Sequence, residues 1–213
     1  MSNAAAQQRR AFWLKHLHQW HWVSASICLV AMLLFSITGI TLNHAAQIAA
    51  KPSVSTVNEK LPAPLLSQLG TPTGEDGEDA EKAPLPASVS EWIGDNMGLE
   101  TVSRIAEWSE DEVYVSMPRP GGDAWLSIDR VSGEVHYERT DRGVVSYLND
   151  LHKGRNAGPL WGWFIDIFAG ACVLFASTGL LLLKMHSTRR PGTWPYVALG
   201  VVVPVVVIIL FVH

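Results

Sequence analysis

The sequence predicts an α-helical membrane protein with three transmembrane helices and a small α+β domain inserted between helices 1 and 2. Three apolar stretches cover residues 23–42, 159–183 and 196–212, and a membrane-spanning helix needs about 20 mostly apolar residues. Alternating strand patterns separated by turn signals occur only in the centre of the chain. The mean hydropathy of +0.15 therefore averages apolar segments and a polar centre.

Basic residues predict the orientation of the three helices. Arg9, Arg10 and Lys15 precede the first stretch, and further basic residues lie in the short connection between the second and third. Short loops rich in Lys and Arg remain in the cytoplasm. We therefore expect a membrane protein with a cytoplasmic N-terminus, a central domain that is periplasmic or extracellular, and a C-terminus on that same outer side. The expected segments are a cytoplasmic tail 1–15, helix 16–46, linker 47–86, periplasmic domain 87–147, interfacial turn and second helix 148–186, cytoplasmic loop 187–195 and third helix 196–213.

A cleaved signal peptide is the alternative interpretation of the first apolar stretch. Basic residues precede the stretch, and Ala45-Ala46 follows it. The apolar run is, however, about twice as long as a typical signal-peptide core, which favours a transmembrane helix. Most of the nine Trp residues flank the apolar runs, as expected for side chains at the interface of a lipid bilayer.

The central segment begins with a predicted linker and continues as a small folded domain. A Gly-, Asp- and Glu-rich piece at 70–82 has almost no large apolar residue and cannot bury enough surface to fold alone. Apolar spacing predicts a helix over 88–97, capped by Ser88 or Ser90. A domain of about 60 residues is only marginally stable alone, so we expect it to pack on the membrane part. Strands are expected over 111–117, 124–129 and 134–139, the last two joined by a turn containing Gly133.

Four of the eight histidines flank two of the apolar stretches in a repeated pattern. Each copy contains a histidine, then a Phe-x-x-Thr-Gly sequence inside the apolar run, then a second histidine. Neutral imidazole is a common protein ligand for metals and haem iron. The first copy comprises His18, Phe35 to Gly39 and His44, and the second comprises His152, Phe175 to Gly179 and His186.

Opposite crossing directions would make the two copies an inverted repeat. This repeat maps His18 onto His152 and His44 onto His186, so His18 faces His186 inside and His44 faces His152 outside. At 1.5 Å per residue, His18 and His44 lie about 39 Å apart on one helix, which exceeds the roughly 30 Å hydrocarbon core. The two pairs are therefore expected near opposite headgroup layers. Gly and Pro residues after His152 should place it on a turn or short interfacial helix.

Paired imidazoles without an open coordination position suit a low-spin electron-transfer haem. We expect one or two haem b groups, with iron bound by His18 and His186 and by His44 and His152. Lys153 is expected to pair with haem propionates, as is Arg155. Two other histidines remain alternative ligands: His21, one turn deeper than His18, and His213, at the end of the third helix.

Several motifs resemble the PepSY-associated transmembrane family. They are Leu17-His18-Gln19-Trp20, the two Thr-Gly pairs and the hairpin from Ile128 to Val135. The stretches 120–125 and 149–156 are similar to a short subgroup of this family. The resemblance covers nearly the whole chain apart from the linker and implies a PepSY-like periplasmic domain. Larger members are linked to haem-bearing inner-membrane reductases of ferric siderophores.

Three functions are compatible with these patterns. The first is a haem-dependent, ferric reductase-like oxidoreductase that transfers electrons across the membrane to a periplasmic acceptor, such as siderophore iron or a flavoprotein. The second is a non-catalytic, membrane-anchored PepSY module for interaction or regulation. Handling of Fe, Cu or Zn at the same histidines is the third function and is disfavoured. Few Met or Cys residues lie near the histidines, which argues against copper, and no carboxylate lies within a tight His cluster. A homodimer is compatible with each function.

Other classes of function are excluded by what the sequence lacks. Sparse, scattered basic residues argue against nucleic-acid binding. The chain has no nucleophile motif, phosphate-binding loop, or nicotinamide or flavin fingerprint, so no residue is assigned a catalytic role. Any reducing equivalents would have to come from another molecule.

Overall fold

The computed structural model describes residues 3–48, 51–70, 81–190 and 192–212. The chain divides into two compact units. One comprises residues 1–34 and 163–213, and the other comprises residues 35–162. We call them the helical unit and the sheet unit.

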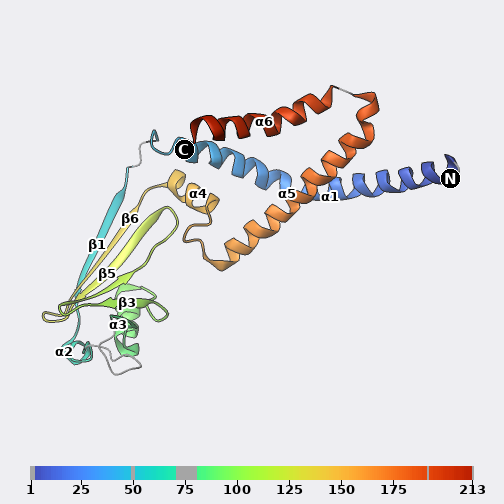
Figure 1. The fold of residues 1–213 in the computed structure, drawn as a ribbon. Helices are drawn as coiled ribbons and strands as arrows, with labels where there is room; N and C mark the ends of the chain where they lie inside the picture. The colour runs from blue at the N-terminus through green and yellow to red at the C-terminus, as the bar shows by residue number, and fades with distance from the viewer. Residues whose placement is uncertain (1–2, 49–50, 71–80, 191, 213) are drawn as a thin grey trace. The chain divides into compact units, whose positions relative to one another are not determined.

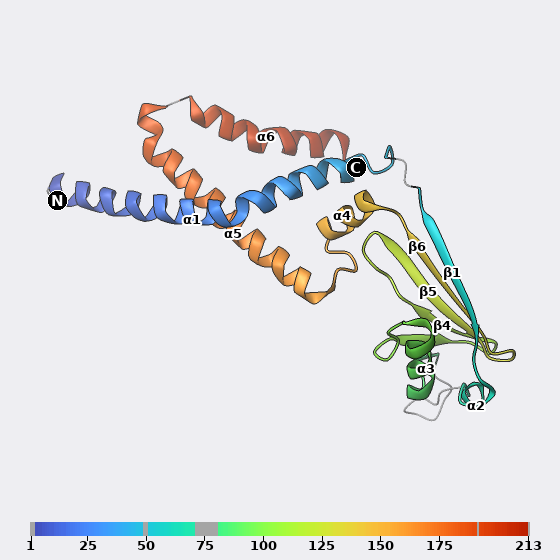
Figure 2. The same cartoon turned by 180° about the vertical axis from the view of Figure 1, so that it is seen from behind.

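The helical unit contains most of three long helices, α1 (Asn3–Asn43), α5 (Gly158–His186) and α6 (Thr193–Phe211), with a short 3₁₀ turn at Ser187–Arg189. All three are long and apolar enough to cross a membrane. Within this unit α1 and α5 cross, as both views show (Figures 1 and 2). At 41 residues, α1 is about 60 Å long and exceeds the hydrocarbon thickness of a bilayer. These helices identify a membrane protein.

Apolar side chains cover the outside of these helices instead of being buried within the unit. No residue of α6 is buried, and Thr178 is the buried residue of α5. Water would make such a surface costly, whereas lipid tails are as apolar as the side chains themselves. The helical unit is therefore built for a bilayer.

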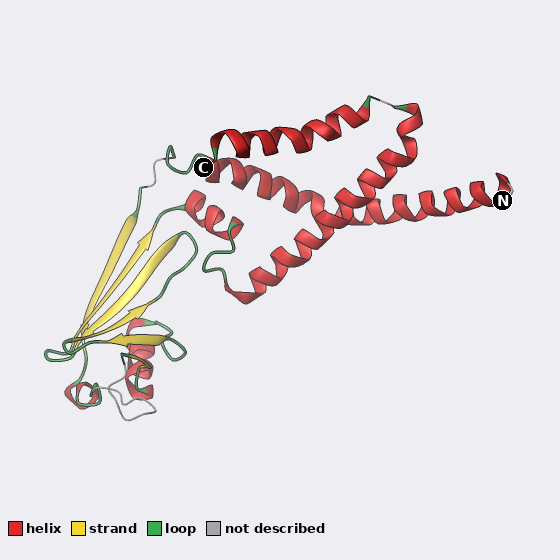
Figure 3. Cartoon of the chain, viewed as in Figure 1, coloured by secondary structure: helices red, strands yellow, loops and turns green. Residues whose placement is uncertain are grey.

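A six-stranded antiparallel sheet forms the centre of the sheet unit, with strand order β1-β6-β5-β4-β3-β2 (Figure 3). Three helices of this unit accompany the sheet: α2 (Ala63–Leu66), α3 (Ala87–Met97) and α4 (Val144–His152). The strands are β1 (Ser53–Lys60), β2 (Lys82–Pro84), β3 (Ile105–Trp108), β4 (Glu112–Ser116), β5 (Gly122–Asp129) and β6 (Glu134–Asp141).

Strict alternation in β4 and β5 builds the core of the sheet unit. Val113 and Leu126 are fully buried, as are their alternate neighbours along each strand. Val89 and Ile93 of α3 pack against this face and belong to the same cluster of buried side chains. Successive residues of a strand point to opposite faces, so the intervening polar residues form the other face. The predicted strands 111–117, 124–129 and 134–139 are confirmed, and the predicted helix 88–97 is found as α3 on an antiparallel sheet that has three further strands.

The structure differs from the predicted linker 47–86 because β1, α2 and β2 lie within it. Every residue of β1 is exposed, so the strand carries no pattern of apolar burial that the sequence could reveal. Backbone pairing with β6 holds it over its whole length, from Ser53 opposite Asp141 to Lys60 opposite Glu134. Most of the Gly-, Asp- and Glu-rich piece lies outside the described residues.

The predicted serine cap of α3 is wrong. The residue at the cap position is Pro86, and no side chain caps the helix. Ser88 lies inside the helix, and its hydroxyl donates a hydrogen bond to Gln68. Ser90 is buried within the helix. The fixed φ of proline starts the helix in the place of a cap hydrogen bond.

Candidate cofactor sites

Two histidine rings of the helical unit lie close together. His18 of α1 and His186, the last residue of α5, have ring centroids 6.1 Å apart and nearly perpendicular planes. Each Nδ1 lies 2.8 Å from the backbone carbonyl four residues earlier, Leu14 for His18 and Leu182 for His186. When Nδ1–H donates to a carbonyl, Nε2 carries the lone pair and can bind a metal. In the neutral form of both rings, Nδ1 therefore carries the proton and Nε2 carries the lone pair.

An open hollow of about 520 Å³ adjoins these two rings. Its lining also contains His21 and Arg190, so it combines three imidazoles with one guanidinium. This volume lies within the usual range for cofactor and ligand sites. Near the same end of α5, the Arg10 side chain donates a 3.0 Å hydrogen bond to the Met185 carbonyl and ties α1 to α5.

His21 lies against the second Phe-x-x-Thr-Gly sequence. Its ring stacks on Phe175 at 4.5 Å, and its Nδ1 lies 3.0 Å from Thr178 Oγ1. The Thr178 hydroxyl donates to the Leu174 carbonyl at 2.7 Å, so it accepts from the imidazole. Gly179 permits this approach, since a Cβ there would lie 3.3 Å from His21 Cε1.

His152 of the sheet unit lies against the first Phe-x-x-Thr-Gly sequence in the same way. Its Nδ1 is 2.7 Å from Thr38 Oγ1, and its ring centroid is 4.9 Å from that of Phe35. A Cβ on Gly39 would lie 3.6 Å from His152 Cε1. Each Phe-x-x-Thr-Gly sequence therefore provides an aromatic ring, a hydroxyl and a gap that together receive one imidazole.

These contacts correct the expected equivalence of the two copies. The sequence repeat mapped His18 onto His152, but the residue in the position equivalent to His152 is His21. The spacing of the residues does not reveal the equivalence of His21 and His152. In the first copy His21 and Thr38 lie on one continuous helix, whereas in the second copy a turn and a helix break separate His152 from Thr178. The useful signal is the Thr-Gly pair, which marks the place where an imidazole packs.

His44 and His152 do not meet in the described part of the chain. The ring of His44 is exposed, and its Nδ1 lies 3.0 Å from the Ile40 carbonyl of its own helix. His152 packs beside Gly39, more than one helical turn before His44. The expected pair of His44 and His152 is therefore not assembled as the pair of His18 and His186 is.

The remaining predicted residues have different positions. Lys153 and Arg155 have exposed side chains, and neither forms an ion pair within the described residues. His213 lies outside the described residues. Within the described ranges, no group of three or more His, Cys, Asp or Glu side chains could hold a metal ion.

Polar contacts fix the helix that carries His152. Thr41 of α1 donates a 2.7 Å hydrogen bond to the side-chain oxygen of buried Asn149, and Trp161 Nε1 donates to the Leu151 carbonyl at 2.8 Å. Both contacted residues of α4 lie within three positions before His152. The short helix α4 is therefore anchored next to the imidazole, a role that the sequence did not assign to these residues.

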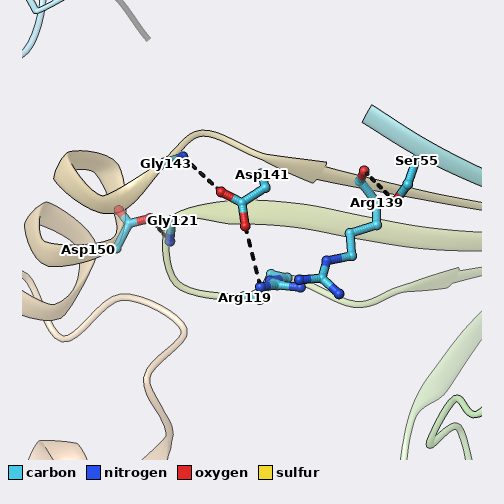
Figure 4. A network of polar contacts seen from close by, with 7 residues as sticks. All are labelled: Ser55, Arg119, Gly121, Arg139, Asp141, Gly143 and Asp150. Carbon is cyan, nitrogen blue, oxygen red and sulfur yellow. Dashed lines mark hydrogen bonds and ion pairs between the residues drawn. The ribbon is translucent and has the colours of Figure 1, made fainter. Parts of the chain in front are cut away.

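The sheet anchors α4 through the loop before β5 (Figure 4). Asp150 accepts a 2.9 Å hydrogen bond from the Gly121 amide. Gly121 has φ +71°, and a Cβ there would lie 2.7 Å from Tyr147 Cα. Asp141 accepts from the Gly143 amide at 2.8 Å, just before α4 begins. The stretches 120–125 and 149–156, which drew attention in the sequence, therefore meet here.

Comparison with known proteins identifies one family. A family model described as Putative PepSY_TM-like matches residues 12–213. No curated protein and no solved structure matches the chain.

Proposed function

The chain belongs to the PepSY_TM-like family, and from this premise we propose that it is a haem b protein that carries electrons across a bacterial inner membrane. Family membership and the three apolar helices make it a membrane protein with a PepSY domain. The single observation that carries the haem proposal is the close pair of His18 and His186. Their ring centroids are 6.1 Å apart at the edge of a 520 Å³ hollow.

The residues of this site fit a haem better than a bare metal ion. A metal lies about 2 Å from each ligating nitrogen, so two imidazoles that share one ion have centroids roughly 6 Å apart. Three imidazoles line the hollow, but no group of three or more metal-ligating side chains among the described residues could hold an ion, and a porphyrin supplies its remaining iron ligands itself. Arg190 in the lining suits a propionate. When bound, the haem supplies one-electron transfer.

The protein residues around the iron would fix the two imidazoles. The Leu14 and Leu182 carbonyls hold the Nδ1 protons and so keep each Nε2 basic. Two histidine ligands leave no position open for oxygen, which favours electron transfer over oxygen activation.

A second haem is proposed at His152 and His44. His152 Nδ1 lies 2.7 Å from Thr38 Oγ1, which directs Nε2 away from that contact, and Lys153 and Arg155 follow in the sequence. The Nδ1 of His44 lies by the Ile40 carbonyl of its own helix, as that of His18 does by the Leu14 carbonyl, so the His44 ring would have to approach His152 for both to ligate one iron. With a cytoplasmic N-terminus, this site lies on the periplasmic side, where ferric siderophore iron or a flavoprotein is the proposed acceptor.

A reduced-minus-oxidised visible spectrum of the purified full chain tests the proposal. Protein produced with ample haem should show a Soret shift and an α-band, and the haem content per chain gives the number of sites. Loss of one ligand by His18→Ala or His186→Ala should remove the inner haem. His16→Ala is the matched control on the same helix, since that ring packs on Phe12.

The spectra distinguish this function from a tether. If the wild-type chain takes up no haem, the PepSY module with a membrane anchor is what remains. If His16→Ala removes as much pigment as His18→Ala, the assigned pair is incorrect. His152→Ala should lower the haem content while it leaves the inner haem in place.

A further inference from the structure

The two faces of the sheet differ in their chemistry. One face packs on α3 and forms the core. The other carries the intervening residues of each strand, which are exposed or partly exposed, such as Glu112 and Tyr114 of β4 and Asp123 and Trp125 of β5. We call this second surface the open face.

An aromatic row crosses three strands on the open face, and a hydrogen bond extends it to a fourth strand. Tyr114 stacks on Trp125 with ring centroids 6.0 Å apart, and Trp125 lies 5.0 Å from His136 of β6. His136 Nδ1 continues the row by a 2.5 Å hydrogen bond to the Asn58 side chain of β1. Neighbouring strands lie about 4.8 Å apart, so this row extends roughly 14 Å across the sheet.

Carboxylates flank the aromatic row on the same face. Glu112 lies two residues from Tyr114 along β4, and Asp123 lies two residues from Trp125 along β5. Glu138 is directly opposite Trp125 in the register of β5 and β6. Within the described ranges none of these three acids forms an ion pair. The middle of the open face is therefore negatively charged and aromatic at once.

The charge is close enough to act on the aromatic residues. Burial raises the pKa of Tyr114, and the negative charges of Asp123, Glu107 and Glu112 raise it further. Beside Tyr114, an open hollow of about 530 Å³ is lined by Glu107 and Glu112 together with Lys82. Lys82 lies 3.3 Å from Glu107 and neutralises one acid at this end, which leaves the other acids free for a partner.

We propose that the open face binds a basic, extended segment of a partner polypeptide. Aromatic faces attract Lys and Arg side chains, and the three unpaired acids are complementary to their charge. The acids are spread along the row instead of converging, and no metal-holding group exists among the described residues. Several cations spaced along a chain match this pattern better than one ion. This binding is independent of haem.

Fluorescence anisotropy of a labelled peptide measures the interaction. A peptide of about eight residues, alternating lysine and threonine, spans roughly 26 Å when extended. The full chain is used in nanodiscs of zwitterionic lipid, so that the membrane itself does not attract the peptide. Binding should weaken as salt rises from about 0.05 M to about 0.5 M because screening shortens the range of exposed charges.

Two sets of substitutions, each of which removes three negative charges, test where the peptide binds. Neutralising the three open-face acids should weaken binding roughly tenfold, because each exposed ion pair with the peptide contributes little by itself. The control neutralises three exposed acids on or beside α3 and should leave binding unchanged. A melting curve of each variant verifies the fold. The open-face set is Glu112→Gln, Asp123→Asn and Glu138→Gln, and the control set is Glu91→Gln, Asp95→Asn and Glu100→Gln.

Each outcome supports or overturns the proposal. Trp125→Leu keeps every acid, so selective loss of binding in this variant supports a role for the aromatic row. Equal loss in the two acid sets would show that net charge alone attracts the peptide and would overturn the site. Absence of wild-type binding overturns it as well. If spermidine competes as strongly as the peptide, the face takes small polyamines instead of a polypeptide.

Discussion

Replacement of Gly121 by alanine tests how the sheet positions α4. The glycine has φ +71°, which costs an alanine about 1–2 kcal/mol. The new Cβ would also lie 2.7 Å from Tyr147 Cα and 2.8 Å from Tyr147 N. These are backbone atoms of α4 and cannot rotate away, so relief requires α4 to shift. Overpacking of this kind costs about 1–3 kcal/mol, and the sum predicts a destabilisation of about 2–5 kcal/mol.

Gly98 provides the matched control for this substitution. Its φ is +68°, but a Cβ there would meet no atom within 4 Å. Gly98→Ala should therefore cost the backbone part alone, about 1–2 kcal/mol. The difference between the two variants isolates the contact between the loop and α4.

Pulse proteolysis of the full chain in detergent, over a urea series, measures both variants. The fraction cleaved at each concentration gives the midpoint for unfolding of the sheet unit, and the stability follows from the slope. Gly121→Ala should have a clearly lower midpoint than Gly98→Ala. Equal midpoints would refute the reasoning, because the loop would then not restrain the helix that carries His152.

Two further predictions use the same unit and the same assay. Leu126 is fully buried, so Leu126→Ala should cost about 2–5 kcal/mol by leaving a cavity, and an unchanged midpoint would contradict the assigned core. Hydrogen bonds from Ser132 and then Val131 lower the pKa of Asp129 below 3.8. The ionised Asp129 carboxylate therefore contributes its full stabilisation at pH values above its pKa in the unfolded chain. This stabilisation is lost as pH falls through its lower pKa in the folded chain. Asp129→Asn should reduce this acid sensitivity, and an unaltered pH profile of the midpoint would count against these hydrogen bonds.

Composition and the alternation of apolar and polar residues were sufficient to predict much of the fold. The three apolar stretches predicted the long helices because length and apolar content alone decide whether a helix can span a bilayer. Strands β4 to β6 were predictable because buried residues such as Val113 and Leu126 alternate with polar ones. Strand β1 was not, since none of its residues is buried and only its pairing with β6 reveals it.

The candidate sites, like the fold, could be predicted from the sequence only in part. The repeated histidines brought His18 and His186 to attention, and the structure places their rings together. The partner of Thr178 could not be read from spacing, because it depends on how α1 and α5 cross. Only this packing shows that His21 is the counterpart of His152. The anchoring role of Asn149 likewise needed the hydrogen bond from Thr41.

The outer edge of β1 has a consequence for how the protein behaves in concentrated solution. An edge strand presents unpaired amide and carbonyl groups to which another chain can add. Here that edge is made of polar residues and ends in a charged pair, Glu59-Lys60, with valine only at two positions. Solvation of these side chains opposes stacking into fibrils. The polar composition of the edge strand β1 thus protects the sheet from aggregation.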